Sequence, residues 1–200
     1  MTTVNHHADH PGFAGVAGLF IGLVMNVMGR AVARLAVELA AVSGADRVVD
    51  VGCGPGTAAR AAARQGARVT GVDPAPVMLR LARRLTRDQR AVVWTEGSAE
   101  GLPLPDGSAT VLWSISTVHH WADVTAGLSE AHRVLVPGGR LLAIERRVSP
   151  GATGLASHGW TERQAESFAA QCTAAGFDDV SVQMRTPGRR AVLVVRAVRP

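Results

Sequence analysis

Residues 48–57 read Val48-Val49-Asp50-Val51-Gly52-Cys53-Gly54-Pro55-Gly56-Thr57. An apolar run of this kind is typical of a buried parallel strand. The glycines that follow allow a tight turn whose backbone N–H groups can approach a ligand closely. The alanine-rich segment after Thr57 favours a helix, and the helix N-terminus would add partial positive charge beside the turn. The stretch therefore predicts a strand, a glycine turn and a helix, an arrangement that binds nucleotides.

The composition predicts a globular chain without a nucleic-acid site. The chain has 200 residues, 47% of them hydrophobic and 18% charged, which is enough for one domain with a sizeable core. Its net charge is +5, and all 21 basic residues are arginines. The one dense arginine group, over residues 80–90, lacks aromatic residues that could stack on bases, so we expect no nucleic-acid partner.

The cysteine and histidine spacing predicts no metal site. Two cysteines, Cys53 and Cys172, are too few and too far apart for a disulfide framework or a zinc site. This cysteine usage predicts a cytoplasmic location. Residues 1–11 contain His6, His7 and His10, which could bind a metal, but a polar tail that binds nothing is the preferred interpretation.

Residues 12–29 carry no charge, and their role is open to two interpretations. A membrane-spanning helix is one, but 18 glycine-rich residues are at the short limit for such a span. We prefer a helix that covers a binding site, continued by an amphipathic helix over residues 30–42. The expected organisation is a tail and helical cover over residues 1–42, followed by a ligand-binding domain over residues 43–200.

From residue 43 onward, strand patterns alternate with helix patterns, which predicts an α/β fold. We expect an open, mostly parallel sheet with helices on both faces, ending in a hairpin over residues 180–198. Ligands in such sheets bind outside the carboxyl ends of the strands. The expected strand ends carry Gly52–Gly56, Asp73, Gly97–Glu100 and Ser114–His120.

Four motifs in order make the chain resemble the class I S-adenosylmethionine (SAM) dependent methyltransferases, in the small-molecule branch called methyltransferase type 11. They are residues 48–56, residues 71–74 (Gly-Val-Asp-Pro), residues 97–108 (Gly-Ser-Ala-Glu-Gly-Leu-Pro-Leu-Pro-Asp-Gly-Ser) and residues 128–139 (Leu-Ser-Glu-Ala-His-Arg-Val-Leu-Val-Pro-Gly-Gly). The resemblance covers roughly residues 43–145. It implies a Rossmann-like methyltransferase fold with seven strands, one of them antiparallel at the C-terminus.

The resemblance also implies which residues bind SAM. The glycine turn would pass beneath the methionine moiety, Asp50 would hold the amino group, and Asp73 would accept hydrogen bonds from both ribose hydroxyls. Asp50 could instead satisfy the backbone of the turn, and Asp73 could cap the next helix. Ser98 stands where the family usually has an aspartate that contacts the adenine. The expected cofactor-binding residues are Asp50, Gly52, Gly54, Gly56, Asp73, Pro74, Met78, Ser98, Ala99 and Ser114.

Methyl transfer from a sulfonium is an in-line displacement, and much of its acceleration comes from alignment of donor and acceptor. A general base is needed only if the acceptor must lose a proton. His119, just past the fourth strand, is the candidate catalytic residue, and a packing role is the alternative.

The expected function is methyl transfer from SAM to an unidentified small molecule, with no commitment to an oligomeric state. The apolar N-terminal segment suggests a hydrophobic acceptor. A SAM-binding protein without transfer activity is the first alternative. The second is an NAD(P)-dependent oxidoreductase, whose dinucleotide fingerprint would need a glycine at position 57, where the chain has Thr57.

Overall fold

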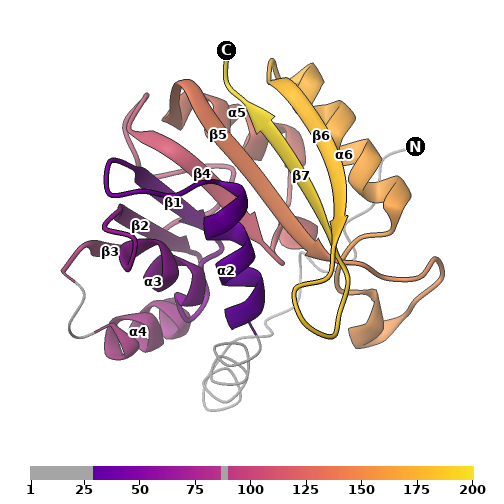
Figure 1. The fold of residues 1–200 in the computed structure, drawn as a ribbon, viewed down its shortest axis with the longest axis horizontal. Coiled ribbons are helices and arrows are strands. Elements are labelled where there is room, and N and C mark those ends of the chain that lie inside the picture. Colours follow the sequence, from indigo (N-terminus) through magenta and orange to yellow (C-terminus); the bar gives the residue numbers. More distant parts are fainter. Residues whose placement is uncertain (1–28, 87–89) are drawn as a thin grey trace.

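The computed structural model describes residues 29–86 and 90–200, which form a single seven-stranded sheet covered by helices (Figure 1). The strands are β1 (Arg47–Val51), β2 (Arg68–Asp73), β3 (Val92–Glu96), β4 (Ala109–Ile115), β5 (Leu135–Arg146), β6 (Asp178–Arg185) and β7 (Val192–Val198). The α-helices are α2 (Arg30–Leu39), α3 (Thr57–Ala63), α4 (Pro76–Leu85), α5 (Val124–Val134) and α6 (Glu162–Ala174), and the 3-10 helices are η1 (Val118–His120) and η2 (Gly154–Ser157).

The strand order is β3-β2-β1-β4-β5-β7-β6. Strands β1 to β5 pair in parallel, whereas β7 is antiparallel to both of its neighbours, β5 and β6. The chain order moves outward from β1 to β3 and then crosses back to β4, so the carboxyl ends of β1 and β4 are adjacent at a topological switch point. This topology confirms the predicted fold class, including the antiparallel strand near the C-terminus.

Side chains alternate between the two faces of the sheet, because successive residues of a strand point to opposite sides. Val48 packs in one hydrophobic cluster with α2 and α3, whereas its neighbour Val49 packs in a second cluster with α5 and α6. Figure 1 shows α2, α3 and α4 together in front of the sheet. Buried alanines such as Ala36 and Ala59 form the contact between α2 and α3, and their small side chains let these helices lie close together.

Strand β5 runs through residues that are typical of a turn. Pro137, Gly138 and Gly139 favour a loop, but β5 begins at Leu135. Leu135 pairs with Ala109 and Arg140 pairs with Val111, so the Pro-Gly-Gly segment forms an irregularity inside the ladder. Gly138 has a φ of +75° there, a conformation that favours glycine. Pairing with β4 thus keeps this segment in the sheet despite its turn-like sequence.

Two charged residues of α5 hold the loop that follows β3. The Glu130 carboxylate accepts a hydrogen bond from the Leu102 backbone N–H at 2.8 Å. Arg133 pairs with Glu130 at 2.7 Å and donates to the Leu104 carbonyl at 2.8 Å and to the Asp106 carboxylate at 2.6 Å. These contacts hold residues 102–106 of the loop over residues 97–108, which the sequence placed beside the cofactor.

The predicted cover at residues 12–29 lies outside the described residues except for Gly29, so its role stays a prediction. Within residues 29–86 and 90–200, no helix combines the length and the apolar character needed to cross a membrane. The helix expected over residues 30–42 is α2, which ends at Leu39. Its buried Ala33 and Ala36 make α2 part of the packed core.

Candidate active site

The glycine turn between β1 and α3 requires glycine at each of its three positions. Gly52, Gly54 and Gly56 have φ values of +69°, +52° and +78°, a region that other residues rarely adopt. A Cβ atom on Gly52 would lie 2.6 Å from the Thr117 side chain, and one on Gly56 would lie 2.1 Å from the Trp94 ring. Neighbouring side chains therefore leave no room for a Cβ atom at Gly52 and Gly56. This is a reason for glycine besides the close ligand approach that the sequence predicts for this turn.

Asp73, the last residue of β2, ties the glycine turn to the next strand. Its Oδ2 accepts a hydrogen bond from the Gly54 N–H at 2.7 Å, and its Oδ1 accepts one from the Ala75 N–H at 2.9 Å. Burial raises the pKa of this carboxyl, and the two backbone N–H groups lower it. Each carboxylate oxygen has two lone pairs, so both oxygens can still accept a hydrogen bond from a ligand.

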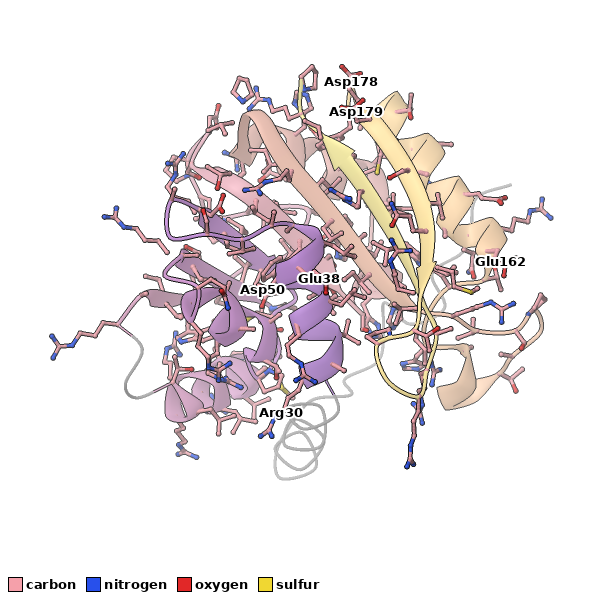
Figure 2. All side chains as sticks on the ribbon, in the orientation of Figure 1. Arg30, Glu38, Asp50, Glu162, Asp178 and Asp179 are labelled. Atoms are coloured by element: carbon pink, nitrogen blue, oxygen red, sulfur yellow. The ribbon has the colours of Figure 1, made fainter. Side chains whose placement is uncertain are left out.

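Asp50 is buried in the interior behind the turn, whereas Glu162 and Asp178 lie at the periphery (Figure 2). Its Oδ2 accepts a hydrogen bond from the Ala59 N–H at 3.0 Å, in the first turn of α3. Because the N-cap residue of α3 is Gly56, which has no side chain, Asp50 takes the place of a capping residue.

Burial raises the pKa of Asp50 to about 7, against the lowering effect of the Trp113 indole N–H and the Ala59 N–H. The negative charge of Asp73 acts in the same direction as burial. Asp50 thus accepts a hydrogen bond from a backbone N–H group, which is the role that the sequence left as an alternative. Its contact with the SAM amino group stays a prediction.

The residues predicted to surround the adenine differ in their accessibility. Pro74 and Ser98 are exposed, so a ligand can reach their side chains. Met78 and Ala99 are buried, so their side chains pack in the protein interior. The Gly97 N–H donates to the Asp73 carbonyl at 3.4 Å, which joins this loop to the end of β2. The predicted adenine contacts themselves stay predictions.

Ser114 and Thr117 connect the end of β4 to the glycine turn. The two hydroxyls are hydrogen-bonded to each other, and Thr117 Oγ1 also donates to the Val51 carbonyl at 3.1 Å. Ser114 therefore holds Thr117 against Gly52. Its predicted contact with the cofactor stays a prediction.

His119 forms a buried dyad with Glu145. Its Nδ1 lies 2.9 Å from Glu145 Oε2, and the Glu145 side chain is fully buried near the end of β5. In the tautomer with the proton on Nδ1, this nitrogen donates to Glu145 and Nε2 carries a lone pair. The buried Nε2 has no hydrogen-bond partner among the described residues. This arrangement can accept a proton or bind a cation.

Two more histidines lie beside this dyad. His120 follows His119 on η1, and its ring centroid lies 4.0 Å from that of His119. His158, from the connection between β5 and α6, lies 5.5 Å from His119 and 5.6 Å from His120 by the same measure. Sequence reasoning missed Glu145 and His158. The sequence does contain a signal for Glu145 as a site residue, because it follows an apolar strand pattern as Asp73 does. No sequence pattern marks His158.

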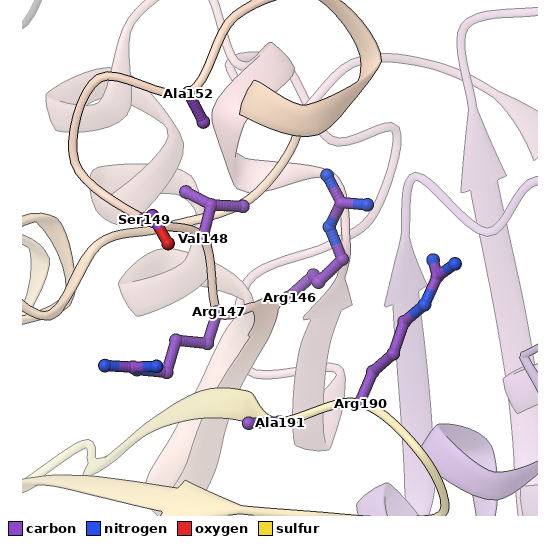
Figure 3. Close-up of a pocket in the computed structure, with 7 residues that line it drawn as sticks. All are labelled: Arg146, Arg147, Val148, Ser149, Ala152, Arg190 and Ala191. Carbon is purple, nitrogen blue, oxygen red and sulfur yellow. The ribbon is translucent and has the colours of Figure 1, made fainter.

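A pocket of about 510 Å³ opens at the carboxyl end of β5 (Figure 3). It is lined by Arg146, Arg147, Val148, Ser149, Ala152, Arg190 and Ala191. The Arg146 Nε–H donates to the His158 carbonyl at 3.0 Å, so the pocket adjoins the segment that carries His158. Three of these residues are arginines, and Arg147 pairs with Glu162 at 3.0 Å.

Comparison with known proteins identifies the family. A family profile described as a methyltransferase domain matches residues 49–143. The demethylmenaquinone methyltransferase of Tropheryma whipplei is 36% identical over 112 residues, which cover 56% of this chain and 46% of the relative. A SAM dependent methyltransferase from Aquifex aeolicus superposes with a TM-score of 0.71 at 17% identity, covering 83% of this chain and 88% of the other. Residues 49–143 thus match a methyltransferase domain, and the chain has the class I SAM-dependent methyltransferase fold.

The matched domain and the fold confirm the predicted resemblance to class I methyltransferases and disfavour the oxidoreductase alternative. A malonyl-[acyl-carrier protein] O-methyltransferase from Serratia marcescens is 33% identical over 140 residues. The match covers 70% of this chain and 53% of that relative. The chain spans about half the length of the curated relatives it matches. The matched profile ends at Ala143 and so leaves out Glu145 and His158.

Proposed function

We propose that this methyltransferase transfers a methyl group from SAM to a small molecule bound beside His119. One observation carries the proposal: Asp73 bonds the glycine turn at the same sheet edge where the His119–Glu145 dyad stands. A donor held by Asp73 and an acceptor held near His119 would both lie outside the carboxyl ends of the strands.

On the donor side, the Asp73 oxygens keep lone pairs for the two ribose hydroxyls. Hydrogen bonds to the Gly54 and Ala75 N–H groups fix the orientation of the carboxylate before SAM arrives. Preorganised hydrogen bonds of this kind favour binding because little freedom is lost when the ligand docks. Asp50, two residues before Gly52, would supply negative charge for the SAM amino group.

On the acceptor side, His119 Nε2 would take the proton that an oxygen, nitrogen or acidic carbon acceptor loses. The sulfonium of SAM supplies an activated methyl group, so the protein's own task is alignment and proton removal. Glu145 fixes the imidazole through Nδ1 and would stabilise its charged form after proton uptake.

The class of acceptor is proposed from the apolar sequence of residues 12–29, which suggests a hydrophobic small molecule. Relatives named as demethylmenaquinone methyltransferases support this class. To test it, the protein is incubated with labelled SAM and a cell extract divided into organic-soluble and aqueous fractions. We expect labelled product in the organic fraction. Label in the aqueous fraction alone would contradict the hydrophobic class, and label in neither would favour a SAM-binding protein without transfer activity.

Donor binding is tested by calorimetry with SAM, S-adenosylhomocysteine and NADH. We expect SAM and S-adenosylhomocysteine to bind, and Asp73→Ala to weaken SAM by about 1–3 kcal/mol. Asp178→Ala, at an exposed position, is the matched control. Because Asp73 also holds the turn, a 2′,3′-dideoxy analogue of S-adenosylhomocysteine completes a double-mutant cycle. If the analogue loses equal affinity for wild type and variant, Asp73 does not hold the ribose. Binding of NADH without SAM would refute the whole proposal.

A further inference from the structure

The side-chain geometry points to a second site on this chain: we propose that His119, His120 and His158 bind a divalent transition-metal ion. Each of these histidines offers an imidazole nitrogen, and the three nitrogens all lie within 4.8 Å of one another. The residues come from two segments, η1 and the β5–α6 connection, that the fold brings to one sheet edge. The site shares His119 with the methyl-transfer proposal, but metal binding is measured directly and does not depend on methyl transfer.

The spacing is close to what a metal ion needs. With metal–nitrogen bonds of about 2.0–2.1 Å, tetrahedral ligands lie about 3.4 Å apart. Binding would require the imidazoles to rotate about their side-chain bonds to close the remaining gap. The buried Nε2 of His119, which has no hydrogen-bond partner within the described part of the chain, is the clearest unused ligand atom. A buried lone pair without a partner is costly, and a bound cation would remove that cost.

Glu145 gives the cluster a feature typical of metal sites. A metal-binding imidazole usually donates its other N–H to a carboxylate or carbonyl, which fixes the tautomer and makes the ligand more basic. The His119 Nδ1–Glu145 Oε2 contact of 2.9 Å has this form. Glu145 is fully buried, so its negative charge favours a cation beside it.

The backbone around the histidines is held in place from both sides. The His120 N–H donates to the Thr117 carbonyl at 2.9 Å, which shapes η1. The Trp160 N–H donates to the Arg146 carbonyl at 2.8 Å, and Arg146 Nε donates to the His158 carbonyl at 3.0 Å. The segment with His158 is thereby anchored to the end of β5. Ligands on anchored backbone need little reorganisation to bind a metal.

Imidazole ligands favour zinc, cobalt, nickel, copper or iron over magnesium and calcium. Three protein ligands leave the fourth tetrahedral position open, as in catalytic rather than structural zinc sites. Thr117, two residues before His119, lies against Gly52 of the cofactor turn, so the histidine cluster follows that turn closely in the fold. An acceptor hydroxyl that occupied the open position would exchange its O–H bond for an O–metal bond and release the proton to solvent. In the metal-loaded protein His119 would therefore be a ligand and not the proton acceptor.

The test uses full-length, tag-free protein stripped of metal by a chelator. Titration with zinc chloride, followed by calorimetry, should show one ion bound per chain, and cobalt(II) should give the intense visible bands of four-coordinate nitrogen ligation. His158→Ala should weaken zinc binding at least tenfold. Glu145→Gln should weaken it about 10–100-fold, the usual effect of losing a carboxylate partner. Far-UV circular dichroism confirms that each variant is folded.

Two controls separate this site from other histidines. His132 lies on α5, outside the cluster, and makes an edge-to-face contact with Phe177, so His132→Ala should bind zinc as wild type does. A variant with His6, His7 and His10 all changed to alanine should also keep the site. The proposal is overturned if wild type binds no zinc, if the N-terminal variant loses the ion, or if His120→Ala/His158→Ala retains wild-type affinity. SAM binding by calorimetry is read separately, so failure of the metal site leaves the methyl-transfer proposal standing.

Discussion

Binding of SAM should release a proton from Asp50. This carboxyl is buried, accepts a hydrogen bond from the Ala59 N–H and has a pKa of about 7. If the SAM amino group docks near it, the ammonium charge favours the ionised carboxylate and lowers its pKa toward the ordinary value near 4. Asp50 must then release its proton as SAM binds. Asp50→Asn removes the group that releases this proton.

The size of the effect follows from the pKa. A group with a pKa of about 7 is about 90% protonated at pH 6 and about 50% protonated at pH 7, so SAM should release about 0.9 and about 0.5 proton at these values. Affinity should consequently fall about tenfold for each pH unit below 7 and level off above it. The free SAM amino group titrates near pH 8, so measurements at pH 6.0–6.5 isolate the contribution of the protein.

Calorimetry in buffers of different ionisation enthalpy counts the released protons directly. Wild type should release about 0.9 proton at pH 6, and Asp50→Asn should release none and bind SAM about 1–3 kcal/mol more weakly. S-adenosylhomocysteine, which keeps the amino group and lacks the sulfonium charge, should release as many protons as SAM. Equal proton release by wild type and Asp50→Asn would refute the assignment and leave Asp50 as the cap of α3 alone.

Three further predictions concern stability and are measured by urea unfolding. Asp50 ionises near pH 4 in the unfolded chain and near pH 7 in the folded one. The free energy of unfolding of wild type should therefore fall by about 4 kcal/mol as the pH rises between these values, and that of Asp50→Asn should fall correspondingly less. Gly56→Ala, which combines a φ of +78° with a Cβ 2.1 Å from Trp94, should cost about 2–4 kcal/mol, whereas Gly101→Ala, with open space around it, should change little; equal effects would contradict the predicted clash. Glu130→Ala removes the acceptor of three hydrogen bonds and should cost about 1–3 kcal/mol, and a loss below 0.5 kcal/mol would argue against its role in holding the loop.

Local signals in the sequence predicted most of the fold. Apolar runs mark the buried parallel strands, and glycines at positions that need positive φ mark the turn between β1 and α3. Strand β5 is where this reasoning failed. Pro137, Gly138 and Gly139 are typical turn residues, but pairing between Leu135 and Ala109, which are 26 residues apart, holds the segment in the sheet. A tertiary contact overrode the local preference, and no local pattern encodes it.

The candidate site also contains residues that the sequence could predict and residues that only the fold brings together. The resemblance predicted Asp50 and Asp73, and Asp73 also ends an apolar strand pattern; both are buried at the turn. Glu145 has the same pattern after four apolar residues of β5, so that signal, applied to every strand, would have found it. His158 belongs to an irregular connection, and only the fold shows that it lies beside His119 and His120.

The three buried carboxylates give this sheet edge a common electrostatic character. Asp50, Asp73 and Glu145 each stand at or next to the end of a parallel strand, and each is at least 94% buried. A buried carboxylate is stable only if hydrogen bonds or a cation compensate its charge. Backbone N–H groups compensate Asp50 and Asp73 in part, and burial still raises the pKa of both. Such an edge favours cationic ligands, and the two proposals place one at each part of it: the sulfonium and ammonium of SAM beside Asp50 and Asp73, and a divalent ion on the imidazole that Glu145 holds.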